Sequence, residues 1–255
     1  MNEFLTDDAR PARRPTLSRI VTPTQIEPSQ RARMYELLSH HYENVSPTKF
    51  EADLDDKDSV VLIEDDLQRI QGFTTSRVLW SVDEDPPVAA VYSGDTLLSP
   101  DYMGERAWLS TWAKHTFGLA RQLSAEHVYW VFAASSHRAY QFLPGFFREY
   151  YPHPDRPTPV PIRRILQQFI AQKFPEGYDP VRGIISGPAC TPYRNPELVA
   201  RTWSRDDRVA RFFASQNPDF LSGNLLACIT EVSPDNVTAV GKRVLGSAIR
   251  SADAS

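Results

Sequence analysis

The chain has 255 residues, 41% hydrophobic and 24% charged, which suits one elaborated globular domain or one domain with a subdomain. Its formal net charge of −4 argues against a surface that tracks nucleic-acid phosphates. The two cysteines, Cys190 and Cys228, form neither a zinc-ligand spacing nor a disulfide framework, so we expect no metal and a reducing compartment. There is no apolar leader and no run near the roughly 18 apolar residues of a membrane span, so we predict a cytoplasmic protein without membrane or nucleic-acid partners.

The first part of the chain predicts a tail, a strand and two helices. Residues 1–16 are polar and have no period, which is typical of a mobile tail. A short strand is expected at 17–22. Residues 29–43 carry apolar side chains at helical spacing, and Ser29 is placed to act as the N-cap. Ser46 is placed to cap a second, shorter helix.

An antiparallel meander and then a strand-turn-helix-strand unit are predicted next. The meander has three apolar or alternating runs, at 58–64, 69–82 and 88–98. Gly94, in the middle of the third run, predicts a β-bulge. A turn then leads into a helix at 106–122 with a 3.6-residue apolar period. A buried strand is expected at 127–134.

The chain after this unit is less regular. A short helix is predicted at 136–144 and a short strand at 146–151. The prolines at 152–161 exclude both helix and central strand. We therefore expect a core at 17–151 to end there and a helical insertion or lid to occupy 152–223.

The last third predicts helices and one strand. Amphipathic helices are expected at 161–174 and 206–214. An extension of the second helix back toward Glu197 is the alternative. The apolar run 224–232 has no neighbouring strand, so we expect it to rejoin the main sheet. Residues 233–255 are predicted as a polar C-terminal tail containing at most one helix. The fold class is α/β, with a mixed, mostly antiparallel twisted sheet flanked by helices.

The turn before the helix at 106–122 carries a recognisable motif. It reads Leu98-Ser99-Pro100-Asp101-Tyr102-Met103-Gly104-Glu105-Arg106-Ala107-Trp108. This stretch resembles the GNAT (GCN5-related N-acetyltransferase) signature V-x-P-x-Y-R-G-x-G-x-G. The proline, tyrosine and first glycine match, whereas Met103 replaces the arginine and Arg106 replaces the second glycine. Further on, Ser136–Tyr140 and Gly145-Phe146 resemble the later N-x-x-A…Y-x-x-x-G-F pattern. The resemblance covers about residues 18–151 and implies a divergent, GNAT-like core.

The resemblance implies that this turn holds the pyrophosphate of an acetyl-CoA or longer acyl-CoA donor. A helix N-terminus offers unpaired N–H groups and the positive end of the helix dipole, which suit a phosphate. Gly104 would let the backbone approach closely, and Arg106 could add a charge-assisted contact. An ordinary strand-to-helix turn is the alternative. The donor-binding residues implied are Leu97, Leu98, Met103, Gly104, Glu105, Arg106, Ala107 and Ser136.

Asp95 and Tyr140 are the candidate catalytic residues. Asp95 is a charged residue in an otherwise apolar strand, which suits either a base or an anchor for the substrate ammonium. A structural aspartate at the bulge is an equal alternative. The resemblance implies Tyr140 as proton donor to the leaving thiolate, while packing on the helix face is its alternative. Tyr92, Ser93 and His137 are the candidate substrate-binding residues, near the point where this strand splays in the resembled family.

Several other polar residues have simpler interpretations. His115 lies among apolar helix positions and is expected to be partly buried and hydrogen-bonded. His40 and His41 are adjacent, so only one of them can face a cleft. Arg163 and Arg164 could contact a carrier protein or the adenosine phosphate of the donor, although such pairs are usually solvated.

The resemblance implies an acyltransferase that moves an acyl group from acyl-CoA, or from acyl carrier protein, to an amine of a small molecule. One alternative is a long-chain N-acyltransferase resembling acyl-homoserine-lactone synthases, with the apolar helix at 161–174 covering the chain. Another is a non-catalytic GNAT-like domain that binds a ligand or partner. Either a monomer or a homodimer fits the sequence.

Overall fold

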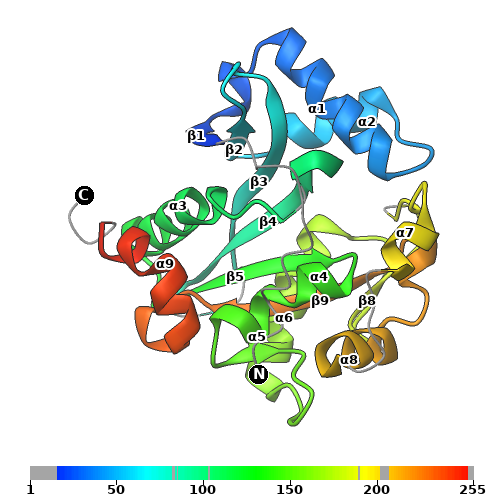
Figure 1. Ribbon diagram of the computed structural model, residues 1–255. Helices are drawn as coiled ribbons and strands as arrows, with labels where there is room; N and C mark the ends of the chain where they lie inside the picture. Colours follow the sequence, from blue (N-terminus) through cyan, green and yellow to red (C-terminus); the bar gives the residue numbers. More distant parts are fainter. Residues whose placement is uncertain are drawn as a thin grey trace.

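The computed structural model describes residues 16–81, 84, 86–102, 104–188, 190–201 and 207–251, so the predicted tail at 1–16 lies almost wholly outside the described residues. Within them the chain builds one nine-stranded sheet in the order β1-β2-β3-β4-β5-β9-β8-β7, with β6 also paired to β9 (Figure 1). The strands are β1 (Leu17–Val21), β2 (Ser59–Glu64), β3 (Ile70–Trp80), β4 (Val88–Leu98), β5 (His127–Ala134), β6 (Tyr150–Tyr151), β7 (Tyr178–Asp179), β8 (Ile184–Ile185) and β9 (Leu225–Glu231).

The sheet is mixed but mostly antiparallel. Every strand pair is antiparallel except β4 with β5. A parallel pair needs a crossover, which the helix α3 provides. The helices are α1 (Pro28–His41), α2 (Pro47–Asp55), α3 (Trp108–Gln122), α4 (His137–Tyr140), α5 (Phe142–Phe146), α6 (Val160–Lys173), α7 (Pro196–Arg201), α8 (Arg208–Gln216) and α9 (Ala239–Ser251).

Helices cover both faces of the sheet because its strands bury side chains on both sides. One face carries α3, α4, α5, α8 and α9 over a core that includes Trp112, Trp130 and Phe213. Figure 1 shows α3 and α9 side by side on this face. On the other face α1 and α2 cover the β2–β3 end, and α6 covers the β4–β5–β9 end. Phe169 on α6 is fully buried there, which is worth about 1.5–3 kcal/mol.

Most of the predicted elements are present near their predicted bounds. The late strand rejoins the sheet as β9, which lies between β5 on one edge and β6 and β8 on the other. The predicted α/β fold class is therefore confirmed. Ser46 caps α2 by accepting a hydrogen bond from the Lys49 N–H at 3.3 Å.

Some local features differ from the sequence predictions. Glu27, followed by Pro28, caps α1 instead of Ser29, because proline suits the first helical position. The strand expected at 146–151 is limited to β6, since α5 continues through Phe146. The short strands β7 and β8 had no sequence signal, and α7 and α8 are separate helices. The helix that the sequence offered within the C-terminal tail is present as α9, which packs on α3.

Candidate functional site

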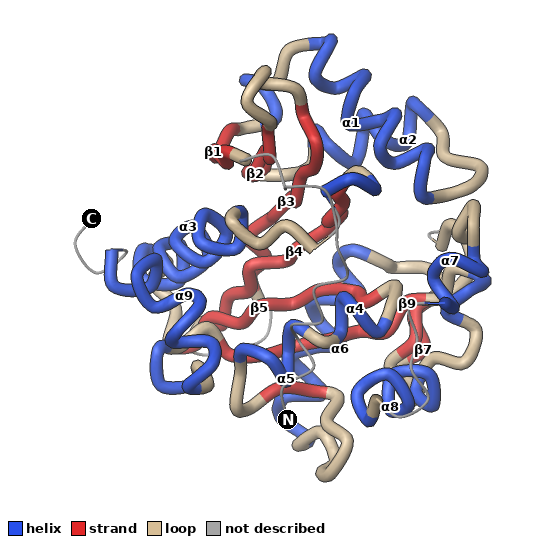
Figure 2. Tube along the Cα trace, in the orientation of Figure 1, coloured by secondary structure: helices blue, strands red, loops and turns tan. Residues whose placement is uncertain are grey.

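The parallel strands β4 and β5 separate halfway along their length. They pair from Val88 opposite His127 to Ser93 opposite Phe132, and no further. Beyond this point β4 continues to Leu98 and β5 to Ala134 (Figures 1 and 2). Separated parallel strands leave backbone N–H and C=O groups free to bind an inserted ligand. We refer to the gap between Gly94–Leu98 and Ala133–Ser136 as the splay.

A β-bulge marks the start of the splay. The register between β3 and β4 shifts so that Thr75 lies opposite both Gly94 and Asp95. A Cβ on Gly94 would approach Thr75 Oγ1 to 2.5 Å and Lys57 Cε to 3.0 Å, so only glycine fits. The Thr75 hydroxyl is buried and has no hydrogen-bond partner among the described residues. The bulge predicted from Gly94 is thus present, and it turns Asp95 toward the face that carries α1, α2 and α6.

Asp95 is a half-buried carboxylate in a charged environment. Among the described residues, no group donates a hydrogen bond to it. Burial, reinforced by the negative charge of Asp53, raises the pKa of the Asp95 carboxyl to about 6, while the ammonium groups of Lys57 and Lys173 act in the opposite direction. A carboxyl that titrates near neutral pH is suited to exchange a proton with a substrate.

Lys57 and Lys173 come from different elements and are tied to the same helix, α2. The Lys57 ammonium donates to the Asp53 carbonyl at 2.9 Å and pairs with the Asp53 carboxylate at 2.5 Å. The Lys173 ammonium, at the end of α6, pairs with the Asp56 carboxylate at 2.7 Å and lies 5.7 Å from the centre of the Tyr92 ring. Through Lys173, helix α6 therefore places a positive charge near Tyr92 and Asp95.

Two tyrosines from distant segments meet at the splay. Tyr42, just after α1, and Tyr193, in the insertion, stack with ring centroids 5.2 Å apart and form an antiparallel bridge. Both hydroxyls interact with Ser135, just after β5, and the Tyr42 hydroxyl senses the charge of Asp95 on β4. Burial raises the pKa of both tyrosines, so both hydroxyls remain protonated at neutral pH. The pair therefore lies at the β5 side of the splay, near enough to Asp95 for its charge to act on Tyr42.

The segment that carries Tyr193 is fastened to the end of α1. The Arg194 guanidinium donates to the Ser39 carbonyl at 2.8 Å, and the Arg194 N–H donates to the His41 carbonyl at 2.9 Å. In return, the Glu43 N–H donates to the Pro192 carbonyl at 2.9 Å. These bonds satisfy carbonyl groups at the helix end that would otherwise lack partners. We call residues 190–194 the strap.

The N-terminus of α3 already holds an anion. The Glu105 carboxylate accepts hydrogen bonds from the Arg106 N–H at 2.6 Å and from the Ala107 N–H at 2.7 Å. Gly104 has a φ of +87°, which a glycine adopts readily. Met103 lies outside the described residues. The N–H groups at this helix start therefore donate to an oxyanion, which here is the carboxylate of Glu105 itself.

Tyr140 does not line the splay. It is 1% exposed, packs against Phe212 and Phe213 of α8, and donates its hydroxyl to the Pro152 carbonyl at 2.7 Å. Burial raises the pKa of its hydroxyl far above the usual value. A buried hydroxyl committed to a backbone carbonyl is poorly placed to protonate a thiolate. This placement favours the packing interpretation, and the hydroxyls at the splay belong to Tyr42 and Tyr193.

The remaining candidates lie around the splay in different ways. Ser93 is buried at the apex, where its hydroxyl accepts from Trp130 Nε1 at 2.9 Å. Tyr92 is buried against Phe174. Ser136 caps α4 and also interacts with the Tyr193 hydroxyl, and His137 is buried in α4. Leu97 is buried against α1, and Leu98 packs against the core on the α3 face.

The simpler predictions for three histidines are confirmed. His115 is half-buried and its Nε2 hydrogen-bonds Ser59 Oγ at 2.6 Å. His40 is exposed, whereas His41 is half-buried with Nδ1 3.1 Å from the Leu37 carbonyl. Burial lowers the pKa of His41, so it is neutral at physiological pH. Only one of the adjacent pair faces inward, as their adjacency requires.

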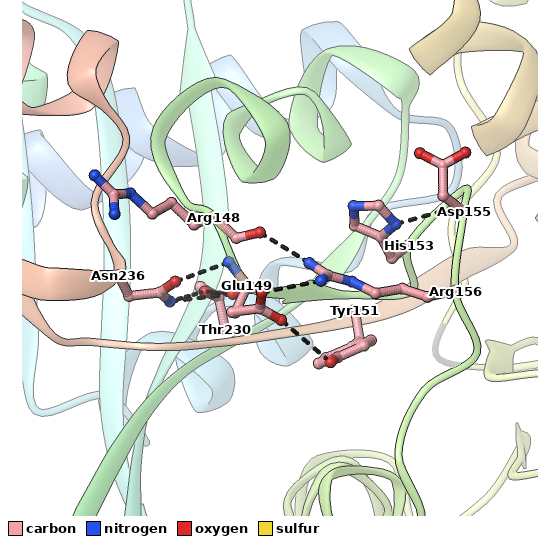
Figure 3. A network of polar contacts seen from close by, with 8 residues as sticks. All are labelled: Arg148, Glu149, Tyr151, His153, Asp155, Arg156, Thr230 and Asn236. Carbon is pink, nitrogen blue, oxygen red and sulfur yellow. Dashed lines mark hydrogen bonds and ion pairs between the residues drawn. The ribbon is translucent and has the colours of Figure 1, made fainter.

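The polar network around Glu149 is structural. Asn236 donates to the Glu149 carbonyl at 3.1 Å and accepts from its N–H at 2.8 Å, while the Glu149 carboxylate pairs with Arg156 at 2.9 Å (Figure 3). The Thr230 hydroxyl donates to the same carbonyl at 2.7 Å. The bonds of Asn236 and Thr230 join the residue before β6 to β9 and the segment after it, while the Glu149–Arg156 ion pair links that residue to the turn after β6. The network therefore fixes residues 149–156 to the sheet. It does not line the splay.

The apolar face of α6 fills the space beside the sheet. Ile165, Leu166, Phe169 and Ile170 are all buried against β4, β5 and β9. These side chains form packed core, not the wall of a tunnel. Arg163 and Arg164, on the outer side of the same helix, are exposed around an open hollow with Val160 and Val181.

No helix in the described part of the chain has both the length and the apolar character needed to cross a bilayer.

No protein-family model and no curated protein matches this sequence. Solved structures similar to it include a GNAT family N-acetyltransferase from Escherichia coli in complex with CoA, at 16% identity and a TM-score of 0.38, covering 53% of this chain and 70% of that one. An Arabidopsis thaliana protein in complex with acetyl-CoA is similar at 13% identity and a TM-score of 0.38, over 53% and 87%. A probable N-acyltransferase from Enterococcus faecalis is similar at 14% identity and a TM-score of 0.40; the match covers 53% of this chain but only 33% of that protein.

These likenesses concern the fold. The mixed sheet, with β4 and β5 parallel and joined by α3, is the GNAT-like arrangement that the sequence motif predicted.

Proposed function

We propose that this protein transfers a short acyl group from an acyl-CoA donor to the amine of a small molecule. The observation that carries the proposal is the separation of β4 from β5 after Ser93, with Asp95 at the bulge beside the opening. A splay of this kind lets a thioester lie between two strands while its acceptor approaches from the face that Asp95 lines. Fold alone does not fix an activity, so the argument depends on this geometry.

The donor's pyrophosphate fits the N-terminus of α3. The Arg106 and Ala107 N–H groups donate hydrogen bonds to the Glu105 carboxylate there, and a phosphate oxygen would accept bonds of the same kind. Gly104 has no side chain that would stand between the backbone and a phosphate. The exposed Arg106 side chain can add a charge-assisted hydrogen bond. When bound, the donor supplies an activated thioester. Glu105 has to move aside to admit it.

Asp95 is proposed as the base. Its carboxylate takes a proton from the incoming ammonium, so that the neutral amine can attack the thioester carbonyl carbon. The C–N bond forms, the C–S bond breaks, and the second proton lost by nitrogen passes to the departing sulfur. The products are an amide and a free thiol. The Tyr42 and Tyr193 hydroxyls, which stay protonated, are placed to donate hydrogen bonds at the splay.

A short acyl group is favoured over a long chain. The face beyond the bulge carries the charged groups of Lys57, Lys173 and Asp53, and an alkyl chain gains nothing from burial against charges. The apolar face of α6, the expected cover for a long chain, is already packed on the sheet. The donor is therefore proposed to be acetyl-CoA or a close homologue, and a long-chain activity is not proposed.

One observation favours a second candidate function, a non-catalytic GNAT-like binding domain. The Glu105 carboxylate occupies the N–H groups that a donor would use, and Tyr140 is withdrawn from the splay. A domain that had lost catalysis would tolerate both features. In that case the splay would still bind a ligand but would not release a thiol.

Calorimetric titration with acetyl-CoA and octanoyl-CoA, followed by a thiol-release assay over an amine panel, tests the proposal. We expect acetyl-CoA to bind, octanoyl-CoA to bind more weakly, and at least one amine to release free thiol. Asp95→Asn should still bind acetyl-CoA while losing thiol release by about 100-fold. Binding without thiol release from any amine would favour the binding domain, and no binding of either donor would refute both.

A further inference from the structure

The space beneath the β4 bulge is reserved for a buried ammonium group. The Lys57 side chain is only 1% exposed, although lysine is almost never fully buried without a partner. Its Cε would lie 3.0 Å and its Nζ 3.8 Å from a Cβ on Gly94, so the missing side chain makes room for it. The ammonium is held from below by the Asp53 carbonyl and carboxylate, at 2.9 and 2.5 Å. Its position is therefore fixed from two sides.

Asp95 follows Gly94 in the bulge, and both lie opposite Thr75. The ammonium beneath Gly94 and the Asp95 carboxylate are thus electrostatic neighbours. Burial lowers the pKa of Lys57, whereas the negative charges of Asp53 and Asp95 act in the opposite direction. An ammonium held near a carboxylate in a poorly solvated place favours the ionised carboxylate.

We propose that Lys57 is a positioning residue for Asp95: its ammonium, fixed beneath the bulge, favours the ionised carboxylate without itself touching substrate. The proposal deepens the function given above, since it rests on Asp95 being the base. Asp53 has two effects. It fixes the Lys57 ammonium, and its own negative charge disfavours the ionised form of Asp95. Asp53 therefore raises the pKa of Asp95, and Lys57 lowers it.

Other charged or titratable groups also face Asp95. Lys173 comes from α6, Tyr42 from the end of α1, and Tyr92 from β4 itself. Lys173 is shared with Asp56 and Asp53, and the tyrosines remain neutral at physiological pH. Lys57 is the cation whose charge lies directly under the bulge. It is therefore the cation whose removal should change the pKa of Asp95 most.

The experiment measures the Asp95 pKa directly, by carbon-13 NMR of side-chain-labelled aspartate, with Asp95→Asn used to assign the signal. In Lys57→Met we expect the pKa of Asp95 to rise by about one unit. In Asp53→Asn, which removes the opposing charge and frees Lys57, we expect it to fall. Asp53 is 47% exposed, so this second variant should fold even where the buried Lys57 substitution does not.

Matched controls come from the same helix. Asp55→Asn removes another α2 carboxylate, whose partner is the Arg31 guanidinium, and Lys49→Met removes an exposed α2 cation. Neither should shift the Asp95 signal. Opposite shifts in the two test variants support the proposal. Shifts of the same sign, or none beyond the controls, overturn it.

The acidic limb of kcat/KM should follow the same pattern, because it reports the pKa of the free-enzyme base. It should move to higher pH in Lys57→Met and to lower pH in Asp53→Asn. The NMR titration needs no substrate. If the pKa of Asp95 shifts in opposite directions in the two variants but the protein releases no thiol, the effect of Lys57 on Asp95 is supported. Only the proposed acyl transfer is then refuted.

Discussion

Tyr42 and Tyr193 stack with their ring centroids 5.2 Å apart, and both hydroxyls interact with Ser135 at the end of β5. One ring belongs to the N-terminal helical pair and the other to the insertion. The insertion is therefore part of the candidate site and not an appendage to it. Arg194 keeps the two segments together by bonding carbonyl groups at the end of α1.

Tyr193→Ala should destabilise the fold by about 1–2 kcal/mol, because it removes a half-buried aromatic stack and loosens the strap. Tyr193→Phe keeps the stack and should cost well under that amount, yet it removes the hydroxyl from the splay and should lower kcat. Urea denaturation and the thiol-release assay measure the two effects. Tyr178→Phe, which changes a half-buried tyrosine on β7, is the control. Equal stability of Tyr193→Ala and Tyr193→Phe would show that the stack contributes nothing.

Glu105→Ala should tighten acetyl-CoA binding by about 3- to 5-fold, because the helix N-terminus then offers uncovered N–H groups to the phosphates. Removing the internal cap should also cost about 1 kcal/mol of stability. Calorimetric titration and thermal denaturation give both numbers. Glu126→Ala, an exposed glutamate at the other end of the crossover, should change neither. Weaker donor binding in Glu105→Ala would mean that Glu105 assists the donor and does not compete with it.

Asp95→Asn should stabilise the protein at pH 8 but not at pH 4. The folded-state pKa is raised to about 6 from 3.8, so the folded state holds a proton that the unfolded state has already lost. Stability from this group is complete below about pH 3.8 and is lost as pH rises through about 6. After solvent screening, the gain in Asp95→Asn at pH 8 should be on the order of 1–2 kcal/mol. Denaturation of both proteins at pH 4, 6 and 8 tests the sign; a gain that grows toward low pH contradicts it.

Gly94→Ala should destabilise the fold by about 1–3 kcal/mol and abolish thiol release. The added methyl would meet the Thr75 hydroxyl at 2.5 Å and Lys57 Cε at 3.0 Å, so the bulge or the lysine has to move. Gly118→Ala is the matched control, since nothing lies within 4 Å of its added carbon on α3. Because alanine favours helix over glycine, Gly118→Ala should stabilise by about 0.5–1 kcal/mol. A Gly94→Ala protein with normal stability would show that the bulge has spare room.

The sequence predicted the sheet well because its signals are local. The 3.6-residue period of α3 and the alternation along β3 each lie within one segment. The bulge had its own signal in Gly94, and Asp95 was conspicuous as a charge in an apolar strand. By contrast, β7 and β8 are two residues each, too short to carry a period.

Lys57, Tyr42 and Tyr193 were not foreseen at the site. Nothing near Lys57 in the sequence distinguishes it from a surface lysine, because its burial results from a glycine on another strand. Tyr140 shows the converse, since a motif position suggested a donor that packing then buried against α8. Local pattern identifies which residues are unusual, but it does not show which of them meet.

The sequence alone thus determined the order of the elements, the GNAT-like strand-turn-helix and the bulge with its aspartate, since each depends on residues close together in the chain. Only the tertiary structure decided that β4 and β5 separate, that Glu105 covers the α3 N-terminus, and that Tyr193 lies beside Tyr42. These features depend on side chains from segments far apart in sequence, which are brought together by burial of the shared core and not by local propensity.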